Sequence, residues 1–152
     1  MPRDRRAISA AHCADRVIDG TAGSPWSQLQ PDFPDGFDMV IESTGVATLI
    51  DSALECLRFE GTMVFEGLYP DQVSFTYELA HERQINAVFP WFIGTSEVRR
   101  TVLRRIVSGE LDFDPLITNQ VNWTDADATY RRLFTSERDH LNGIVIDWRG
   151  AE

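Results

Sequence analysis

The sequence contains no lysine. All 14 of its basic residues are arginine, against 24 Asp and Glu, so the formal net charge is −10 at pH 7. A negative field of this kind repels phosphates and anionic lipid headgroups, which argues against nucleic-acid and membrane partners. A lysine-free acidic surface suits a cell with a salt-rich interior, because salt screens carboxylate repulsion. GC-rich coding, which favours arginine codons, explains the same bias, and both explanations stay open.

Cysteine is scarce as well, with only Cys13 and Cys56 present. They lie on two separate helix-like stretches, and their spacing gives no disulfide framework. Neither has a second ligand at zinc-finger spacing. We therefore expect two free, partly buried thiols and no metal site built from this chain.

Long hydrophobic runs are missing. No stretch approaches the roughly 18 apolar residues that a membrane span requires. The basic start of the chain is not followed by an apolar segment, so it does not read as a secretory signal. With 152 residues, 43% of them hydrophobic, the chain is long enough for a domain with a core. These features predict a soluble, cytoplasmic protein.

Recognisable catalytic and phosphate-binding motifs are also missing. There is no G-x-G-x-x-G loop to hold a pyrophosphate. His12, His81 and His140 are scattered, without a partner at the spacing of a metal site or a catalytic triad. We expect them to be surface or capping residues, and we assign no catalytic residue to this chain.

The clearest pattern that is present is a strand–helix–strand unit. An apolar strand is predicted at 37–42, and apolar residues at helical spacing predict a helix over 46–57. Gly61 then breaks the pattern before a second strand at 62–65. A βαβ unit implies parallel strands and a right-handed crossover. The predicted fold class is α/β, with a partial Rossmann-like parallel sheet flanked by helices.

The remaining elements are predicted from shorter patterns. In chain order we expect a helix at 5–14, a strand at 16–19, a loop at 20–36 with one helical turn near Trp26, an extended piece at 73–75, a helical turn at 78–83, a strand at 84–89, a helix capped by Ser96 and ending at Ser108, an extended segment after Pro115, a helix capped by Thr124 and Asp125 that ends at Leu133, and a strand at 143–148. We expect the final segment to pair with something other than the βαβ sheet.

Two strand ends carry a glycine. The first is Ser43-Thr44-Gly45-Val46 and the second is Glu66-Gly67-Leu68-Tyr69. Ligands of open α/β sheets bind beyond the carboxyl ends of strands, and glycine lets the backbone approach them closely. The alternative is that both are ordinary turns.

The aromatic run at 89–92 fits a planar ligand, a subunit contact or core packing equally well. The arginine pairs at 99–100 and 104–105 fit a solvated helix face better than an anion site.

Six stretches, in order, resemble the zinc-type medium-chain alcohol dehydrogenases. They are the helix-to-strand segment at 5–19, DMVIESTG at 38–45 with LRFEGTMVFEG at 57–67, HERQI at 81–85, DPLITN at 114–119, DADATY at 125–130 and IVIDW at 144–148. The resemblance covers nearly the whole chain. It implies that residues 1–111 are part of an NAD(P)-binding Rossmann domain, and that residues 112–152 return to the catalytic domain.

The resemblance also implies positions around the cofactor. Gly45 and Val46 would lie near the adenosine side of NAD(P), and Arg5 or Arg6 near the adenosine ribose. The nicotinamide would be approached by Gly67, Leu68, Phe89 and Pro90. Asn142 stands where relatives often carry a basic residue that faces the pyrophosphate, so we expect weak cofactor binding.

The family's zinc ligands, proton relay, first Rossmann strands and glycine loop belong to segments that have no counterpart here. We therefore expect the C-terminal part of a dehydrogenase that transfers hydride between NAD(P) and a secondary alcohol, and that is inactive alone. Its partners would be an alcohol substrate and either a second copy or a complementing N-terminal chain. The alternative is a stand-alone, non-catalytic interaction or dimerisation module. Substrate and the choice of NAD or NADP stay open.

Overall fold

The computed structural model describes residues 5–91 and 94–150. These residues form two compact units: one contains residues 18–91, and the other joins residues 5–17 to residues 94–150. The fold is α/β with parallel sheets, as predicted. The predicted boundary between residues 111 and 112 concerns the parts of a larger enzyme and stays a prediction. No helix in the described ranges is long and apolar enough to cross a bilayer.

The unit of residues 18–91 is built on a three-stranded parallel sheet in the order β1-β2-β3. Its elements are α2 (Pro25–Leu29), β1 (Phe37–Glu42), α3 (Ile50–Glu55), β2 (Leu57–Phe65), α4 (Tyr77–Glu82) and β3 (Asn86–Val88). The predicted βαβ unit is therefore present, and α4 provides a second crossover from β2 to β3. Because the strands are parallel, their carboxyl ends meet at one edge of the sheet.

The core of this unit lies on one face of the sheet. Ile50 and Leu54 of α3 are buried against Leu57, Met63 and Phe65 of β2. Residues of α4 pack against the same cluster, so both crossover helices cover this face. On the other face, side chains such as Met39 and Ile41 of β1 remain exposed by 54% and 57%.

The helix predicted at 46–57 is shorter than expected. A 3₁₀ turn spans Ala47–Leu49, α3 ends at Glu55, and Leu57 already begins β2. The apolar period continues to Leu57 because its side chain is buried in the same core, although its backbone belongs to the strand.

Gly61 was predicted to separate a helix from a strand, but it lies inside β2. The pairing of β1 with β2 is irregular there, since Phe37 pairs with Leu57 and Met39 with Thr62. The additional residues of this bulge include Glu60, whose φ of 56° is left-handed. A Cβ atom on Gly61 would lie 2.9 Å from the carbonyl oxygen of Arg58, so the bulge needs glycine.

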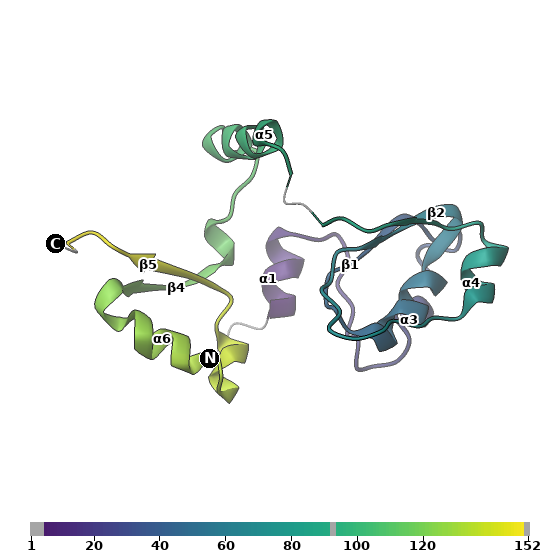
Figure 1. Ribbon diagram of the computed structural model, residues 1–152, viewed down its shortest axis with the longest axis horizontal. Coiled ribbons are helices and arrows are strands. Elements are labelled where there is room, and N and C mark those ends of the chain that lie inside the picture. Colours follow the sequence, from purple (N-terminus) through teal and green to yellow (C-terminus); the bar gives the residue numbers. More distant parts are fainter. Residues whose placement is uncertain (1–4, 92–93, 151–152) are drawn as a thin grey trace. The chain divides into compact units, whose positions relative to one another are not determined.

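The other unit contains α1 (Arg5–His12), α5 (Ser96–Val107), β4 (Ile117–Asn122), α6 (Ala126–Arg132) and β5 (Gly143–Asp147). Here β4 and β5 pair in parallel as a separate two-stranded sheet, which agrees with the expectation that the final segment pairs outside the βαβ sheet. Helix α6 lies along this sheet (Figure 1), and Thr129 and Leu133 line a small cavity with Ile144 and Ile146 of β5.

One predicted helix cap is displaced by one residue, and the other is at the predicted position without a side-chain hydrogen bond. The side chain of Thr95, not Ser96, caps α5 by accepting a hydrogen bond from the Val98 N–H at 3.3 Å. Asp125 stands at the N-cap of α6, as predicted, but its side chain makes no capping hydrogen bond. The Asn122 side chain accepts from the Thr124 N–H at 3.0 Å and opens the preceding 3₁₀ turn at Trp123–Asp125. Asx and threonine caps of this kind shift easily by a residue or two, because neighbouring polar side chains compete for the same N–H groups.

The strand predicted at 16–19 is not formed. The Asp19 carboxylate instead accepts hydrogen bonds from the backbone N–H and hydroxyl of Thr21, which closes a turn. Residues 73–75, predicted only as an extended piece, lie outside any helix or strand, and the strand predicted at 84–89 is confined to Asn86–Val88. A strand needs a hydrogen-bonded neighbour, and apolar residues alone do not supply one.

Both cysteines are free, as predicted, but only one is buried. Cys13 is exposed just after α1, whereas Cys56 lies between α3 and β2 and its thiol donates to the carbonyl oxygen of Ser52 at 3.3 Å. Burial, with the neighbouring charge of Glu55, raises the pKa of the Cys56 thiol. The prediction that Cys13 is partly buried is therefore wrong.

Candidate functional site

A groove of about 570 Å³ opens at the carboxyl ends of β2 and β3. Parallel pairing places these ends together, because Val64 of β2 pairs with Val88 of β3. Four of the predicted cofactor residues line this one groove: Gly67, Leu68, Phe89 and Pro90. The remaining lining residues are Phe65, Tyr69, Asp71, Val73, Phe75 and Trp91.

One wall of the groove is aromatic. The Phe65 and Phe89 rings stack with centroids 4.7 Å apart and planes 10° apart, and Phe75 lies 6.5 Å from Phe65. Phe89 and Trp91 are 71% and 89% exposed, so they are not core residues in this unit. Of the uses considered for the run at 89–92, core packing is wrong for these two; Phe92 lies outside the described residues. Stacked, open aromatic rings suit a flat partner.

Glycine is required where the two predicted turns meet. Gly45 has a φ of +71°, and a Cβ atom there would lie 2.5 Å from the carbonyl oxygen of Leu68. A Cβ atom on Gly67 would lie 2.7 Å from both Gly45 Cα and a carboxylate oxygen of Glu42. The two turns therefore pack backbone against backbone, which is more than ordinary turns at separate strand ends require.

Glu42, the last residue of β1, holds these turns together and was not singled out from sequence. Its backbone oxygen accepts from the N–H groups of Glu66 and Gly67 at 2.9 and 2.8 Å. Its carboxylate accepts from the Thr44 N–H at 2.7 Å, the Gly45 N–H at 3.2 Å, and the hydroxyls of Thr44 and Tyr69. The sequence shows an acidic residue at the end of an apolar strand, but it shows neither the burial of Glu42 nor its partners.

The Glu42 side chain is buried, with 5% of the residue exposed, yet it is held ionised. Burial alone raises the pKa of this carboxyl, but the hydrogen bonds from Thr44, Tyr69 and Gly45 outweigh burial and lower the pKa below its ordinary value. The reciprocal effect falls on the phenol: burial, with the hydrogen bond to Glu42, raises the pKa of Tyr69 to about 12. Tyr69 therefore donates to a carboxylate at neutral pH.

The structure places the remaining predicted residues as follows. Gly45 and Val46 lie in the turn after β1, beside the groove, and Val46 donates its N–H to the Thr44 hydroxyl at 3.1 Å. Arg5 and Arg6 belong to α1 in the other unit. The Arg5 guanidinium donates to the carbonyl oxygens of Arg138 and Leu141 at 2.9 and 3.0 Å. It joins α1 to the segment before β5, and its role near a ribose stays a prediction.

Asn142, predicted to weaken phosphate binding, makes hydrogen bonds within its own unit. Its backbone N–H donates to the Thr118 hydroxyl at 3.0 Å, and its side-chain amide donates to the Leu116 carbonyl at 3.1 Å. These bonds join the start of β5 to the start of β4.

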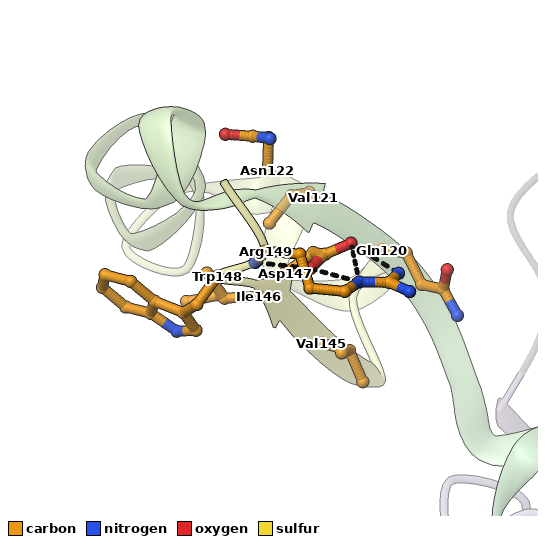
Figure 2. A pocket seen from close by; sticks show the side chains of 8 residues that line it. All are labelled: Gln120, Val121, Asn122, Val145, Ile146, Asp147, Trp148 and Arg149. Atoms are coloured by element: carbon orange, nitrogen blue, oxygen red, sulfur yellow. Dashed lines mark hydrogen bonds and ion pairs between the residues drawn. The ribbon is translucent and has the colours of Figure 1, made fainter. Parts of the chain in front are cut away.

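A second hollow, of about 370 Å³, lies at the carboxyl ends of β4 and β5 (Figure 2). Two charged residues line it, and they pair with each other. The Arg149 guanidinium donates hydrogen bonds to both carboxylate oxygens of Asp147 at 2.7 to 3.0 Å. The Arg149 hydrogen bonds lower the pKa of Asp147 to about 2, and the pair stays charged at neutral pH. Trp148, drawn pointing away from this pair, stacks on Trp123. Both charges are satisfied by each other, so this hollow offers no free acid or base.

The described residues contain no group of three His, Cys, Asp or Glu side chains that could hold a metal ion. His12, His81 and His140 are all exposed, as predicted, and His81 pairs with the hydroxyl and ring of Tyr77.

The four arginines of α5 are exposed too, as a solvated face requires, but no residue of α5 is buried, so its apolar face is open as well.

The family of the chain follows from a comparison with known protein families. Residues 3–108 match the family model described as zinc-binding dehydrogenase. The chain belongs to the zinc-binding dehydrogenase family. The groove thus lies inside the segment that this dehydrogenase family shares, and so do all eight predicted cofactor residues.

Two proteins to which the chain is similar are named as dehydrogenases. The chain is similar to D-arabinitol dehydrogenase 1 of Uromyces fabae, at 35% identity over 43% of this chain and 20% of that protein. It is also similar to L-galactonate-5-dehydrogenase of Escherichia coli K12, at 24% identity over 93% of this chain and 42% of that protein. The chain therefore spans less than half of these relatives.

The same fold occurs in a solved complex with a nicotinamide cofactor. A short chain alcohol dehydrogenase of Escherichia coli CFT073, complexed with NADH, matches 95% of this chain with a TM-score of 0.79 and 12% identity. This chain covers 42% of that structure. At this identity the likeness shows the fold of the zinc-binding dehydrogenase chain and nothing finer.

Proposed function

We propose that this chain forms the nicotinamide side of the cofactor site in a zinc-dependent, NAD(P)-linked dehydrogenase that oxidises secondary alcohols of the polyol or sugar class. The observation that carries the proposal is the groove at the ends of β2 and β3. Gly67, Leu68, Phe89 and Pro90, expected from resemblance to approach the nicotinamide, all line it. The fold alone does not require a groove there, since loops could fill the space.

The groove has the character that a nicotinamide ring needs. The ring is flat, and the exposed faces of Phe89 and Trp91 offer a stacking wall. The close approach of Gly45 to Gly67 leaves backbone, rather than side chains, beside the opening. When bound, the nicotinamide supplies hydride transfer; this chain's residues orient the ring and exclude water on one side. Gly45 and Val46 would lie toward the adenosine, with Arg5 or Arg6 near its ribose.

Zinc does not fit the described residues of this chain, because they contain no suitable cluster of ligands. We therefore assign no step of the reaction to a metal held here. The metal and the proton relay would come from a further part of the enzyme, as the resemblance to zinc-type medium-chain alcohol dehydrogenases implies. The chain alone would be inactive, and it would need either a covalently continuous or a separately supplied catalytic domain.

A non-catalytic interaction or dimerisation module is the second candidate. The observation that favours it is strand β1, which pairs with β2 on one side and has no other strand partner among the described residues. Its side chains Met39 and Ile41 are more than half exposed. An unpaired, apolar edge strand is a common site for adding a strand from another chain, including a second copy.

The experiment that separates the two is isolation of the native polypeptide with an antibody raised to residues of this chain. Its mass and its NAD(P)-linked oxidation of D-arabinitol, with and without a zinc chelator, are then measured. A mass well above 17.2 kDa with chelator-sensitive activity supports the dehydrogenase. A complex that contains a second, zinc-binding chain supports it too. A lone 17.2 kDa polypeptide without activity contradicts it and favours the interaction module.

A further inference from the structure

The corner of the groove between β1 and β2 depends on one buried side chain. Glu42 ends β1, and its two carboxylate oxygens divide four donors between them. One oxygen accepts from the N–H and hydroxyl of Thr44, and the other accepts from the Gly45 N–H and the Tyr69 hydroxyl. These donors come from the turns that follow two different strands.

Tyr69 connects this arrangement to the groove. Its side chain lines the groove with Gly67 and Leu68, while its hydroxyl reaches back to the Glu42 carboxylate. On the other side, the Gly45 turn packs against the Leu68 backbone. Movement of Glu42 would therefore release the Gly45 turn and the Tyr69 ring together.

We propose that Glu42 is a positioning residue for the cofactor groove, and that Tyr69 carries its effect to the groove wall. The carboxylate holds the Gly45 turn and the Tyr69 ring in place, so that the backbone of Gly67 and Leu68 keeps its shape. The consequence for cofactor affinity rests on the proposed function, whereas the positioning itself can be measured without any ligand.

A carboxylate is required for this task rather than any polar group. Two of the four donors are backbone N–H groups, which cannot reverse and accept. In Glu42→Gln one acceptor oxygen becomes an NH₂ group, so either the Thr44 N–H or the Gly45 N–H faces another donor. The side chain keeps its size, and only the acceptor pattern changes.

The first test is amide hydrogen exchange of Thr44 and Gly45 in the 152-residue chain, followed by NMR. Glu42→Gln is expected to accelerate exchange at one or both amides by roughly tenfold or more, because a hydrogen bond to a charged acceptor is lost. Tyr69→Phe removes one donor only; it should leave these amides protected and shift the resonances of Gly67 and Leu68. Tyr77→Phe, at another tyrosine of the same unit, is the control and should change neither. Unchanged exchange in Glu42→Gln would overturn the proposal.

The second test reads the Tyr69 phenol directly. With Tyr77 and Tyr130 replaced by Phe, Tyr69 is the one tyrosine left in the chain. Ultraviolet difference absorbance should give a midpoint near 12, and Glu42→Gln should move it toward the ordinary value of 10. If Glu42 only stabilised the fold and did not contact Tyr69, its replacement would not move this midpoint. The same midpoint in both proteins would contradict the arrangement.

Cofactor binding is then compared by adding NADH to the wild-type chain and to Glu42→Gln. Weaker shifts at Gly67 and Leu68 in the variant support the positioning role at the cofactor site. Absence of any NADH response in the wild type overturns the proposed function, and with it the consequence for the cofactor. The exchange and absorbance results distinguish that failure from a failure of the Glu42 arrangement.

Discussion

At the scale of single residues, Gly45 and Gly67 form the contact between the turns after β1 and β2, and the Glu42 carboxylate holds both turns. Gly45 and Gly67 stand in sequence directly after apolar strands, where α/β proteins bind ligands. Nothing in the sequence indicates that Glu42 accepts hydrogen bonds from Tyr69, 27 positions away. Such a bond depends on the parallel pairing of β1 and β2, which brings the two turns together only in the folded chain.

Gly67→Ala is expected to destabilise the chain by about 1–3 kcal/mol, the range found when an added methyl has no space. The new Cβ atom would lie 2.7 Å from Gly45 Cα, and backbone cannot move aside as a flexible side chain can. Urea unfolding measures the change. Gly20→Ala is the matched control, because a Cβ atom there meets nothing within 4 Å. Equal stability of the two variants would mean that the turns are not packed together as described.

The stability of the chain should depend on the ionisation of Glu42. Its folded-state pKa is below the ordinary 4.5, so the carboxylate contributes stability that is fully present above that value. This contribution is lost as the pH falls through the lower folded-state pKa. Glu42→Gln should be less stable at neutral pH and should lose less stability on acidification, as urea unfolding at several pH values would show. Parallel acid profiles for the two proteins would contradict this.

At the scale of elements, the positions of the main helices and strands were predictable, and their ends were not. The apolar runs of β1 and β5 and the period of α5 were sufficient to locate them. The end of α3 was misplaced because Leu57 is buried whether it is helical or extended. The strand expected at 16–19 failed because a sequence pattern cannot show whether a neighbouring strand exists to pair with it.

Arg83 shows what helix ends require beyond the local sequence. One terminal nitrogen of its guanidinium donates to the carbonyl oxygens of Leu54, Glu55 and Leu57, at 3.2, 2.7 and 2.7 Å. The first two carbonyls end α3, where the helix has no partner of its own for them. The residue was noted in sequence only as part of a family-like stretch, and its partners lie more than 25 positions earlier.

Arg83→Ala is therefore expected to destabilise the chain by about 1.5–3 kcal/mol, the usual loss for hydrogen bonds to a charged group. Arg100→Ala, which removes an exposed arginine of α5, should change stability by no more than about 0.5 kcal/mol. Thermal or urea unfolding of both variants measures the difference. A loss in Arg100→Ala as large as that in Arg83→Ala would show that net charge, rather than the carbonyl contacts, is responsible.

At the scale of the whole molecule, the chain spans less than half the length of the relatives to which it is similar. It spans 42% of L-galactonate-5-dehydrogenase and 20% of D-arabinitol dehydrogenase 1. In the part of the chain that the structure describes, one edge of β1 has no strand partner and one face of the sheet keeps exposed apolar side chains. Parallel sheets in α/β proteins are normally covered on both faces. Among the described residues, the sheet therefore has one unpaired edge and one face with exposed apolar side chains.

The most direct test of the central claim is an NMR titration of the isotopically labelled chain with NADH. We expect the amide resonances of Gly67, Leu68 and Phe89 to shift with a common, weak affinity, because the groove that they line would receive the nicotinamide. Resonances of β4 and β5, around the second hollow, should stay in place. Shifts confined to β4 and β5, or no shift at the highest soluble NADH concentration, would contradict the assignment of the groove to a nicotinamide cofactor.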